Sequence, residues 1–208
     1  MTTDLMLRCR CGELRGRASG LAPSTATQLI CYCADCQAFA RWLGRDDILD
    51  ERGGSAIFQM PPAQVTFTAG ADRLACVRLS DKGMHRWYAA CCRTPIGNTM
   101  GPRMAFIGLL HNFIELPPAG PERDAVFGKP IRVHGRSAIG GRPPDAPATI
   151  APGAMVKFLF RFVSWSLSGG AQPSPVFTAE RRPRATPEVL SATERARLRP
   201  IGAAPDRG

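Results

Sequence analysis

The sequence lacks any stretch of eighteen or more uncharged apolar residues, which is roughly the length a helix needs to cross a bilayer. Its beginning, Met1-Thr2-Thr3-Asp4, also lacks the basic segment and the apolar run of a secretory signal peptide. We therefore expect no membrane span and a cytoplasmic location. In a reducing compartment, clustered thiols are more often metal ligands than disulfides.

Lysine is scarce, because 24 of the 27 basic residues are Arg, and the formal net charge is +10. An excess of positive charge can indicate a protein that binds nucleic acid. Here the Arg residues are scattered among Ala, Pro and Gly along the whole chain, and no aromatic RNA-reading motif accompanies them. We therefore expect no nucleic-acid partner.

Cysteine, in contrast, is plentiful. Of the eight Cys, three lie within six residues, at Cys31, Cys33 and Cys36. A pair at i, i+2 on an extended segment presents both sulfurs to one side, and the next step of three residues closes a turn beneath them. Thiolates at this spacing favour zinc or an iron–sulfur cluster over magnesium or calcium. A fourth local ligand is missing, so the sequence predicts an open metal site unless a distant residue completes it.

The other cysteines give weaker signals. Cys9 and Cys11 form a second pair at i, i+2, at the end of a predicted strand. Cys91 and Cys92 would point to opposite faces of a regular strand, although a turn could bring both to one ion. Cys76 stands alone in an apolar strand, so we interpret it as a small buried hydrophobic residue rather than a ligand.

Residues 1 to 116 alternate between short β-prone runs and turn signals, and this pattern predicts a mainly β structure, most simply an antiparallel meander. The turn signals include Gly53-Gly54, Gly70-Ala71-Asp72 and Asp81-Lys82-Gly83. Pro117-Pro118 marks the end of this compact part. The expected strands cover residues 5–11, 14–18, 27–33, 55–60, 64–68, 74–79, 85–89 and 104–110, with a short helix over 37–43.

Residues 117–208 form a Pro-, Gly- and Arg-rich extension, for which we expect loops, a short strand at Ile131–Val133 and a helix over about 154–168. A capping box beginning at Ser191 predicts one more short helix before or within the basic tail. The helix at 154–168 is apolar except for a stripe at Lys157, Arg161, Ser164 and Ser168. Its wide apolar face must be covered by the β body, which we favour, by a second subunit, or by a membrane surface.

The spacing of the thiols resembles a known family. The elements are Cys9-x-Cys11-Gly12, the three-Cys segment at 31–36, Gly54 before an apolar strand, and Arg86-Trp87-Tyr88 leading to Cys92-Arg93-Thr94-Pro95. Over about residues 5–116 they resemble the glutathione-dependent formaldehyde-activating family, which includes centromere protein V. The resemblance implies a β-tent fold with two zinc sites.

The resemblance also implies roles for the cysteines. Cys31, Cys33 and Cys36 would hold a reactive zinc with an open place, while Cys9 and Cys11 would pair with a late Cys-x-x-Cys motif to hold a structural zinc. Here the first position of that late motif is Ala89, and the nearest spare thiol is Cys91. Either Cys91 replaces the absent ligand through a reshaped turn, or three thiols including Cys92 hold the zinc, or that site holds none.

The resemblance implies a carbon–sulfur lyase or synthase that adds a thiol such as glutathione to formaldehyde. A non-catalytic, zinc-stabilised binding module and a redox or metal-handling protein are the alternatives. Asp35 could support the metal ligands, but we expect it to cap the helix that follows. Arg41 and Arg45 could hold carboxylates of the thiol, and neither is assigned.

Overall fold

Two β-sheets form the body of the protein, seen in a computed structural model that describes residues 2–199. The smaller sheet is antiparallel, with strand order β1-β2-β5. It consists of β1 (Thr3–Arg8), β2 (Arg15–Leu21) and β5 (Val65–Ala69). The prediction of a mainly β fold built of short antiparallel strands is confirmed.

The larger sheet has eight strands in the order β10-β3-β4-β9-β8-β7-β6-β11. All neighbouring pairs are antiparallel except the two outermost, β10 with β3 and β11 with β6. The strands are β3 (Thr27–Cys31), β4 (Ser55–Met60), β6 (Leu74–Arg78), β7 (His85–Ala89), β8 (Thr94–Thr99), β9 (Ile107–Leu110), β10 (Ile131–Val133) and β11 (Pro187–Val189).

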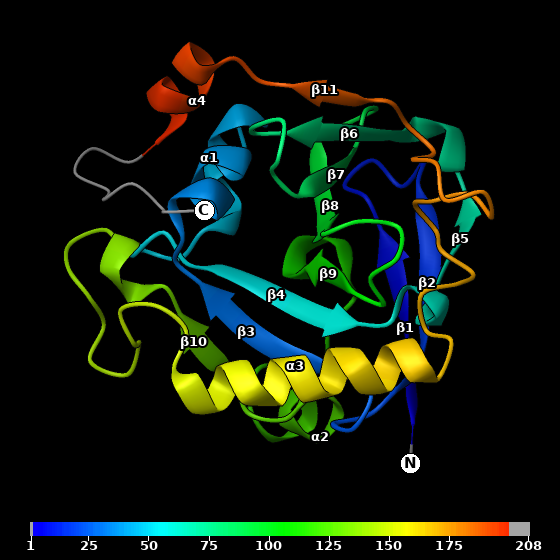
Figure 1. Ribbon diagram of the computed structural model, residues 1–208, viewed down its shortest axis with the longest axis horizontal. Coiled ribbons are helices and arrows are strands. Elements are labelled where there is room, and N and C mark those ends of the chain that lie inside the picture. The colour runs from blue at the N-terminus through cyan, green and yellow to red at the C-terminus, as the bar shows by residue number, and fades with distance from the viewer. Residues whose placement is uncertain (1, 200–208) are drawn as a thin grey trace.

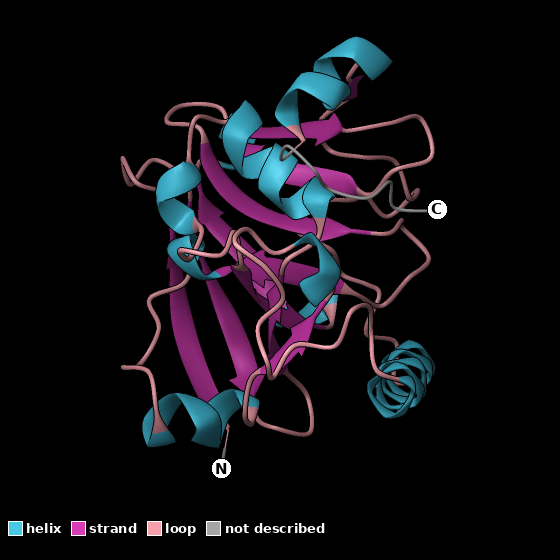
Figure 2. Cartoon of the chain, turned by 90° about the vertical axis from the view of Figure 1, so that its left-hand side faces the viewer, coloured by secondary structure: helices cyan, strands magenta, loops and turns pink. Residues whose placement is uncertain are grey.

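The described residues include four α-helices. They lie around the sheets (Figures 1 and 2). They are α1 (Ala34–Trp42), α2 (Pro121–Phe127), α3 (Pro152–Leu167) and α4 (Ala192–Leu198). Helices α1 and α4 pack together at one corner, and α3 lies across the front of β3 and β4 in Figure 1. Within residues 2–199, none of the helices combines the length and the apolar character needed to cross a membrane.

The sequence did not predict α2, β11 or β8. Strand β8 was not expected because Pro95 and Gly97 are both unfavourable in strand interiors. The structure accommodates Pro95 where the pairing of β7 with β8 shifts register. Gly97 is required because a Cβ there would lie 2.4 Å from the carbonyl oxygen of Gly108 on β9. All six residues of β8 are buried, so this strand is central to the fold.

The main hydrophobic core joins side chains of both sheets, including Leu7 and Leu14 from the smaller one and Phe58 and Trp87 from the larger one. Trp87 is fully buried, and its indole Nε1 donates a hydrogen bond to Thr99 Oγ1 at 3.0 Å. This hydrogen bond gives the buried indole N–H of Trp87 an acceptor. The core therefore fixes β7 and β8 relative to each other.

The part of the chain after residue 116 is built into the same sheet. The predicted strand at Ile131–Val133 is present as β10, which extends the sheet beside β3, and β11 extends its opposite edge beside β6. The predicted helix over about 154–168 is present as α3. Edge strands from the extension cover both outer strands of the antiparallel part, which protects their backbone groups.

Helix α3 uses one side to contact the body. Phe158 and Trp165 are buried, and Phe162 packs edge-on against Phe106 with ring centroids 5.2 Å apart. Arg161, from the predicted polar stripe, donates to backbone carbonyls of the loop between β2 and β3. The opposite side remains apolar and exposed, at Met155, Val156, Leu159, Phe160, Val163 and Leu167.

Candidate metal centres

The three-thiol cluster lies at the junction of β3 and α1. Cys31 is the last residue of β3, Cys33 is the residue that caps the N-terminus of α1, and Cys36 lies in the first turn of that helix. Their Sγ atoms all lie within 4.8 Å of one another. The structure thus brings together the three sulfurs that the sequence predicts for the open site.

The local backbone explains this convergence. The Cys36 amide N–H donates to Cys33 Sγ at 3.3 Å, which is the hydrogen bond that an N-cap side chain normally accepts. The expectation that Asp35 caps the helix is therefore wrong, because Cys33 occupies that position. Asp35 instead lies in the first helical turn, where its negative charge is favourable next to the helix N-terminus.

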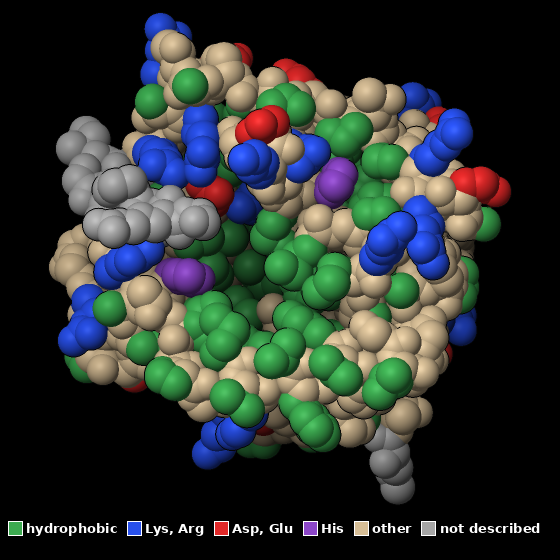
Figure 3. All heavy atoms as spheres, in the orientation of Figure 1, with side chains coloured by type: hydrophobic (Ala, Val, Ile, Leu, Met, Phe, Trp, Pro, Cys, Tyr) green, Lys and Arg blue, Asp and Glu red, His purple; other side chains and the backbone are tan. Residues whose placement is uncertain are grey.

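Apolar side chains surround the three thiols. Cys31 is buried, and the cluster packs against Leu29, Ile57, Val133 and Phe158. Figure 3 shows a hollow between α3 and α1 on this face, with hydrophobic side chains around it and basic side chains at its upper border. Apolar walls lower the local dielectric constant and strengthen the interactions of any charge held there.

A buried arginine lies next to the cluster. The side chain of Arg86, on β7, is only 4% exposed, and its Nη1 lies 3.8 Å from Cys36 Sγ. Its Nη2 lies 4.0 Å from Asp35, and the guanidinium sits over the ring of Phe39 at 5.6 Å. Arg86 therefore places a permanent positive charge beside a metal-ligand candidate.

The thiols and Arg86 shift one another's pKa values. Hydrogen bonds from the Cys31 and Cys33 thiols, together with the charge of Arg86, lower the pKa of Cys36 well below its usual range. Contacts with the Cys33 and Cys36 thiols, followed by burial, raise the pKa of Cys31. For Cys33, the hydrogen bond with Cys31 lowers the pKa, but the contact with Cys36 and burial outweigh it, so the pKa of Cys33 is also raised. Although burial disfavours the charged guanidinium, negative charge on Cys36 and Cys33 raises the pKa of Arg86. Of the three thiols, Cys36 is therefore the one whose thiolate the surroundings favour most.

Asp35 connects this site to helix α4. Its Oδ1 lies 3.2 Å from Arg195 Nη2 and 3.6 Å from Arg199 Nη2. Sequence reasoning did not assign Arg86, Arg195 or Arg199 to the site. Arg86 belongs to the Arg-Trp-Tyr segment quoted for the family resemblance, whereas the α4 arginines carry no local motif.

The second cluster contains Cys9, Cys11, Cys91 and Cys92, whose sulfurs also lie within 4.8 Å of one another. The measured separations of the Sγ atoms are 3.5 Å for Cys9 and Cys11, 3.9 Å for Cys9 and Cys91, 3.3 Å for Cys11 and Cys91, and 3.8 Å for Cys91 and Cys92. The structure therefore brings Cys91 to the cluster together with Cys92.

Two turns produce this arrangement. Cys9 and Cys11 lie in the turn after β1, where Gly12 adopts a φ of +81°, and the other pair lies in the turn between β7 and β8. Adjacent cysteines converge there because that turn replaces regular strand geometry, and Arg93 within it has a φ of 54°. Ala89, the last residue of β7, is fully buried in the main core, and its carbonyl oxygen accepts a hydrogen bond from the Cys92 amide at 3.4 Å.

Thr94 links the two turns of the four-thiol cluster. Its Oγ1 accepts a hydrogen bond from the Arg10 amide at 3.0 Å and lies 3.0 Å from Cys92 Sγ. Although partial burial favours the neutral thiol, the hydrogen bond with Thr94 and contacts with Cys11 lower the pKa of Cys92 to about 6. The turn geometry thus favours a thiolate before any ligand binds.

Both clusters can hold a metal ion. Tetrahedral zinc places its sulfur ligands roughly 3.8 Å apart, close to the separations in the four-thiol cluster. Four thiolates are the ligand set of a closed structural site, and three thiolates leave a coordination place open. In the part of the chain that the structure describes, the three-thiol cluster gains no fourth ligand from Cys, His, Asp or Glu.

The remaining candidates lie elsewhere. Cys76 is buried and joins neither cluster, and burial raises the pKa of its thiol to about 12. Arg41 donates to the Leu198 carbonyl, and Arg45 forms a two-pronged ion pair with Asp47. Both arginines therefore have partners in the fold, and neither contacts a thiol of the clusters.

Comparison with known proteins gives a family without a described activity. Residues 1–187 match the family of unknown function DUF6151. The chain belongs to this family. A search of curated proteins gives no match. The part matching DUF6151 contains both cysteine clusters and α3, whereas α4, with Arg195 and Arg199, lies beyond it.

Proposed function

We propose that the protein is a zinc-dependent carbon–sulfur lyase or synthase that adds a thiol to a small aldehyde, or releases it, at the three-thiol cluster. The proposal rests mainly on three converging sulfurs, for which the described residues provide no fourth ligand. The buried charge of Arg86 lies beside them. We expect the activity in the cytoplasm, because eight free cysteines suit a reducing compartment. The resemblance to the glutathione-dependent formaldehyde-activating family supports the same chemistry.

Two zinc ions suit the two sets of donors. Cys31, Cys33 and Cys36 would hold the reactive ion, and the four-thiol cluster would hold a structural one. Zinc bound by three thiolates would take the substrate thiol as a fourth ligand and lower its pKa. Three thiolates carry one more negative charge than zinc neutralises, and the buried guanidinium of Arg86 offsets this excess.

The residues around the cluster position the substrates and exclude water. In the forward direction, the substrate sulfur attacks the carbonyl carbon of the aldehyde, and a carbon–sulfur bond forms. The electron pair of the broken C=O π bond moves to the oxygen, which takes up the proton that the thiol released. The apolar walls from Leu29, Ile57 and Phe158 keep bulk water from competing for the carbonyl.

The test is the rate at which ¹³C-formaldehyde and its S-hydroxymethyl glutathione adduct interconvert at equilibrium, measured by exchange NMR. An equilibrium measurement separates catalysis from the spontaneous reaction, because a catalyst raises both rates and leaves the concentrations unchanged. We expect the wild-type protein with zinc to raise the exchange rate above that of the buffer. The Cys36→Ala variant should lose this effect.

The control is Cys76→Ala, which removes a buried thiol that belongs to neither cluster. It should retain the wild-type exchange rate per folded molecule. Exchange that is equally fast in buffer, wild type and Cys36→Ala would rule out the proposed catalysis.

The exposed side of α3 favours a second candidate, a zinc-stabilised binding module that associates with another copy of itself through this helix. Phe160 is 78% exposed and Leu167 is 84% exposed, which is unusual for large apolar side chains on one helix face. Sedimentation velocity tests this candidate. It predicts dimers for the wild type and monomers for Phe160→Glu, and a monomeric wild type at high concentration would contradict it.

A further inference from the structure

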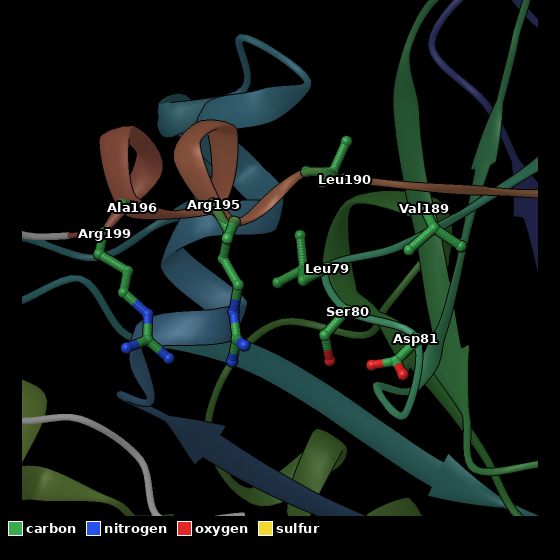
Figure 4. Close-up of a pocket in the computed structure, with 9 residues that line it drawn as sticks. Leu79, Ser80, Asp81, Val189, Leu190, Arg195, Ala196 and Arg199 are labelled. Atoms are coloured by element: carbon green, nitrogen blue, oxygen red, sulfur yellow. The ribbon is translucent and has the colours of Figure 1, made fainter.

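Arg195 of α4 and Arg199, the residue that follows this helix, both reach the three-thiol site. Figure 4 shows the side chains of Arg195 and Arg199 extending from the helix in the same direction, with their guanidinium groups next to each other. Both contact Asp35, at 3.2 Å and 3.6 Å, in the helical turn that also contains Cys36. Arg86 Nη2 lies 4.0 Å from the other carboxylate oxygen of Asp35, Oδ2. Three guanidinium groups therefore share one carboxylate.

The α4 arginines retain unused hydrogen-bonding capacity. The Nε atoms of Arg195 and Arg199 are buried and donate to no acceptor in the described chain. A buried donor without a partner loses its hydration without compensation, so an acceptor placed there would be stabilised. A carboxylate fits best, because a guanidinium can bind its two oxygens with two parallel hydrogen bonds.

These side chains also border a cavity of about 430 Å³. Its lining combines the two arginines with apolar residues from the loop after β6 and from β11, as well as one acidic residue. The acidic residue is Asp81. The two arginines that border the cavity outnumber this carboxylate, so the lining itself keeps a net positive charge.

The position of α4 does not depend on these two guanidinium groups alone. Ser191 and Glu194 form a complete capping box at its start, and the carbonyl oxygen of Leu198 accepts a hydrogen bond from Arg41 of α1. Leu190 and Leu198 pack on the hydrophobic cluster under α1. Docking of the helix is thus provided by other contacts, which leaves the paired arginines free for a binding role.

We propose that Arg195 and Arg199 form a subsite that positions a carboxylate of the substrate, and that the protein acts on a mercapto acid. The sulfur of that substrate would lie at the three-thiol cluster, and its carboxylate would compete with Asp35 for the two guanidinium groups. This inference rests on the proposed function for the thiol end of the substrate. The arginines are positioning residues, because they would bind the carboxylate end of the substrate and not its reacting sulfur.

Binding of three small ligands to the zinc-loaded protein tests the subsite by calorimetry. 3-Mercaptopropionate carries a thiol and a carboxylate, 2-mercaptoethanol carries the thiol alone, and 3-(methylthio)propionate keeps the carboxylate but has no free thiol. We expect 3-mercaptopropionate to bind at least about tenfold more tightly than 2-mercaptoethanol. A gain of this size is typical of a charge-assisted, two-pronged hydrogen bond. In the Arg195→Gln/Arg199→Gln double variant, this preference should fall to within about threefold.

Arg197→Gln is the matched control, because Arg197 lies on the same short helix, is exposed, and contacts no residue of the site. It removes one positive charge from the same helix, where the double variant removes two, and should retain the tenfold preference. A preference that survives in the double variant, or equal affinities for the two thiols in the wild type, would overturn the subsite.

The third ligand separates this inference from the proposed function. One outcome would be that 3-(methylthio)propionate binds only when Arg195 and Arg199 are present, and that neither thiol ligand binds more tightly than 3-(methylthio)propionate. In that case the carboxylate subsite stands and the thiol chemistry fails. If the thiols bind but no carboxylate contributes to affinity, the thiol chemistry stands and the subsite is overturned. Absence of any arginine-dependent binding likewise overturns the subsite.

Discussion

The two cysteine clusters use the same ligand atoms in different settings. The four-thiol cluster joins two turns that are far apart in the sequence, since Cys9 and Cys91 are 82 residues apart. The three-thiol cluster comes from six consecutive residues and lies among apolar side chains next to Arg86. A metal at the first cluster therefore closes a long loop, whereas a metal at the second constrains little of the chain.

The difference suggests a division of roles. Four thiolates saturate a tetrahedral ion and stabilise the fold, and Cys11 of this cluster is exposed at the surface. Three thiolates leave one coordination place, and the buried charge of Arg86 beside them suits a ligand that binds and dissociates. If this comparison is right, variants of the two clusters should separate stability from ligand binding.

Cys11→Ala should have the largest effect on stability. The side chain is exposed, so its loss removes a metal ligand without opening a cavity in the core. Because the bound metal closes a long loop, we expect the melting temperature to fall by roughly 10 °C or more and the zinc content to fall by one ion. Calorimetry and elemental analysis measure the two. An unchanged melting temperature would show that this cluster does not stabilise the fold.

Arg86→Gln should weaken metal binding at the three-thiol cluster alone. Partners of metal ligands typically change affinity by about ten- to a hundredfold. Arg86 lowers the pKa of Cys36, so its removal raises that pKa and protons compete better with the metal. Zinc should then leave this cluster at a higher pH than in the wild type during acidification, as a zinc-sensitive dye would report. Release at the same or a lower pH would contradict the role of Arg86.

Cys36→Ala should remove a zinc ion, as Cys11→Ala does, but with a much smaller loss of thermal stability. It removes one ligand from a site within one short segment, so we expect a loss of one zinc ion and a decrease of only about 2–5 °C in melting temperature. A decrease as large as that of Cys11→Ala would mean that both clusters are structural.

Thr94→Val should have the smallest effect on metal content. It removes the hydroxyl that accepts from the Arg10 amide and contacts Cys92, while it keeps the shape of the side chain. We expect about 1–2 kcal/mol of lost stability with the zinc content unchanged. Denaturant unfolding measures this change, and loss of a zinc ion would show that the hydroxyl is essential to the cluster itself.

The sequence predicted the features that depend on near neighbours. The three-thiol spacing, the strand at Ile131–Val133 and the apolar helix at 154–168 are local patterns, and the structure contains all three features. Strand β8 was not predicted because Pro95 and Gly97 are atypical of strand interiors. Its pairing with β7 and β9 explains why these two residues are tolerated there.

Long-range contacts explain what the sequence could not predict at the site. Arg86 contacts a thiol 50 residues away, and Arg195 contacts a carboxylate 160 residues away. The cap of α1 was misassigned to Asp35 because carboxylates are common caps, whereas here Cys33 both caps the helix and belongs to the thiol cluster. Packing of distant segments, rather than local pattern, therefore decides which charges surround the metal ligands.

The most direct test of the account is a thiol titration of the cobalt-substituted protein. Cobalt reports each sulfur ligand through thiolate-to-metal charge-transfer absorption. An open place at Cys31, Cys33 and Cys36 predicts that added glutathione raises this absorption and that the rise saturates at one thiol per protein. Absorption that stays constant at saturating glutathione would show that the place is closed and would contradict the proposed thiol chemistry.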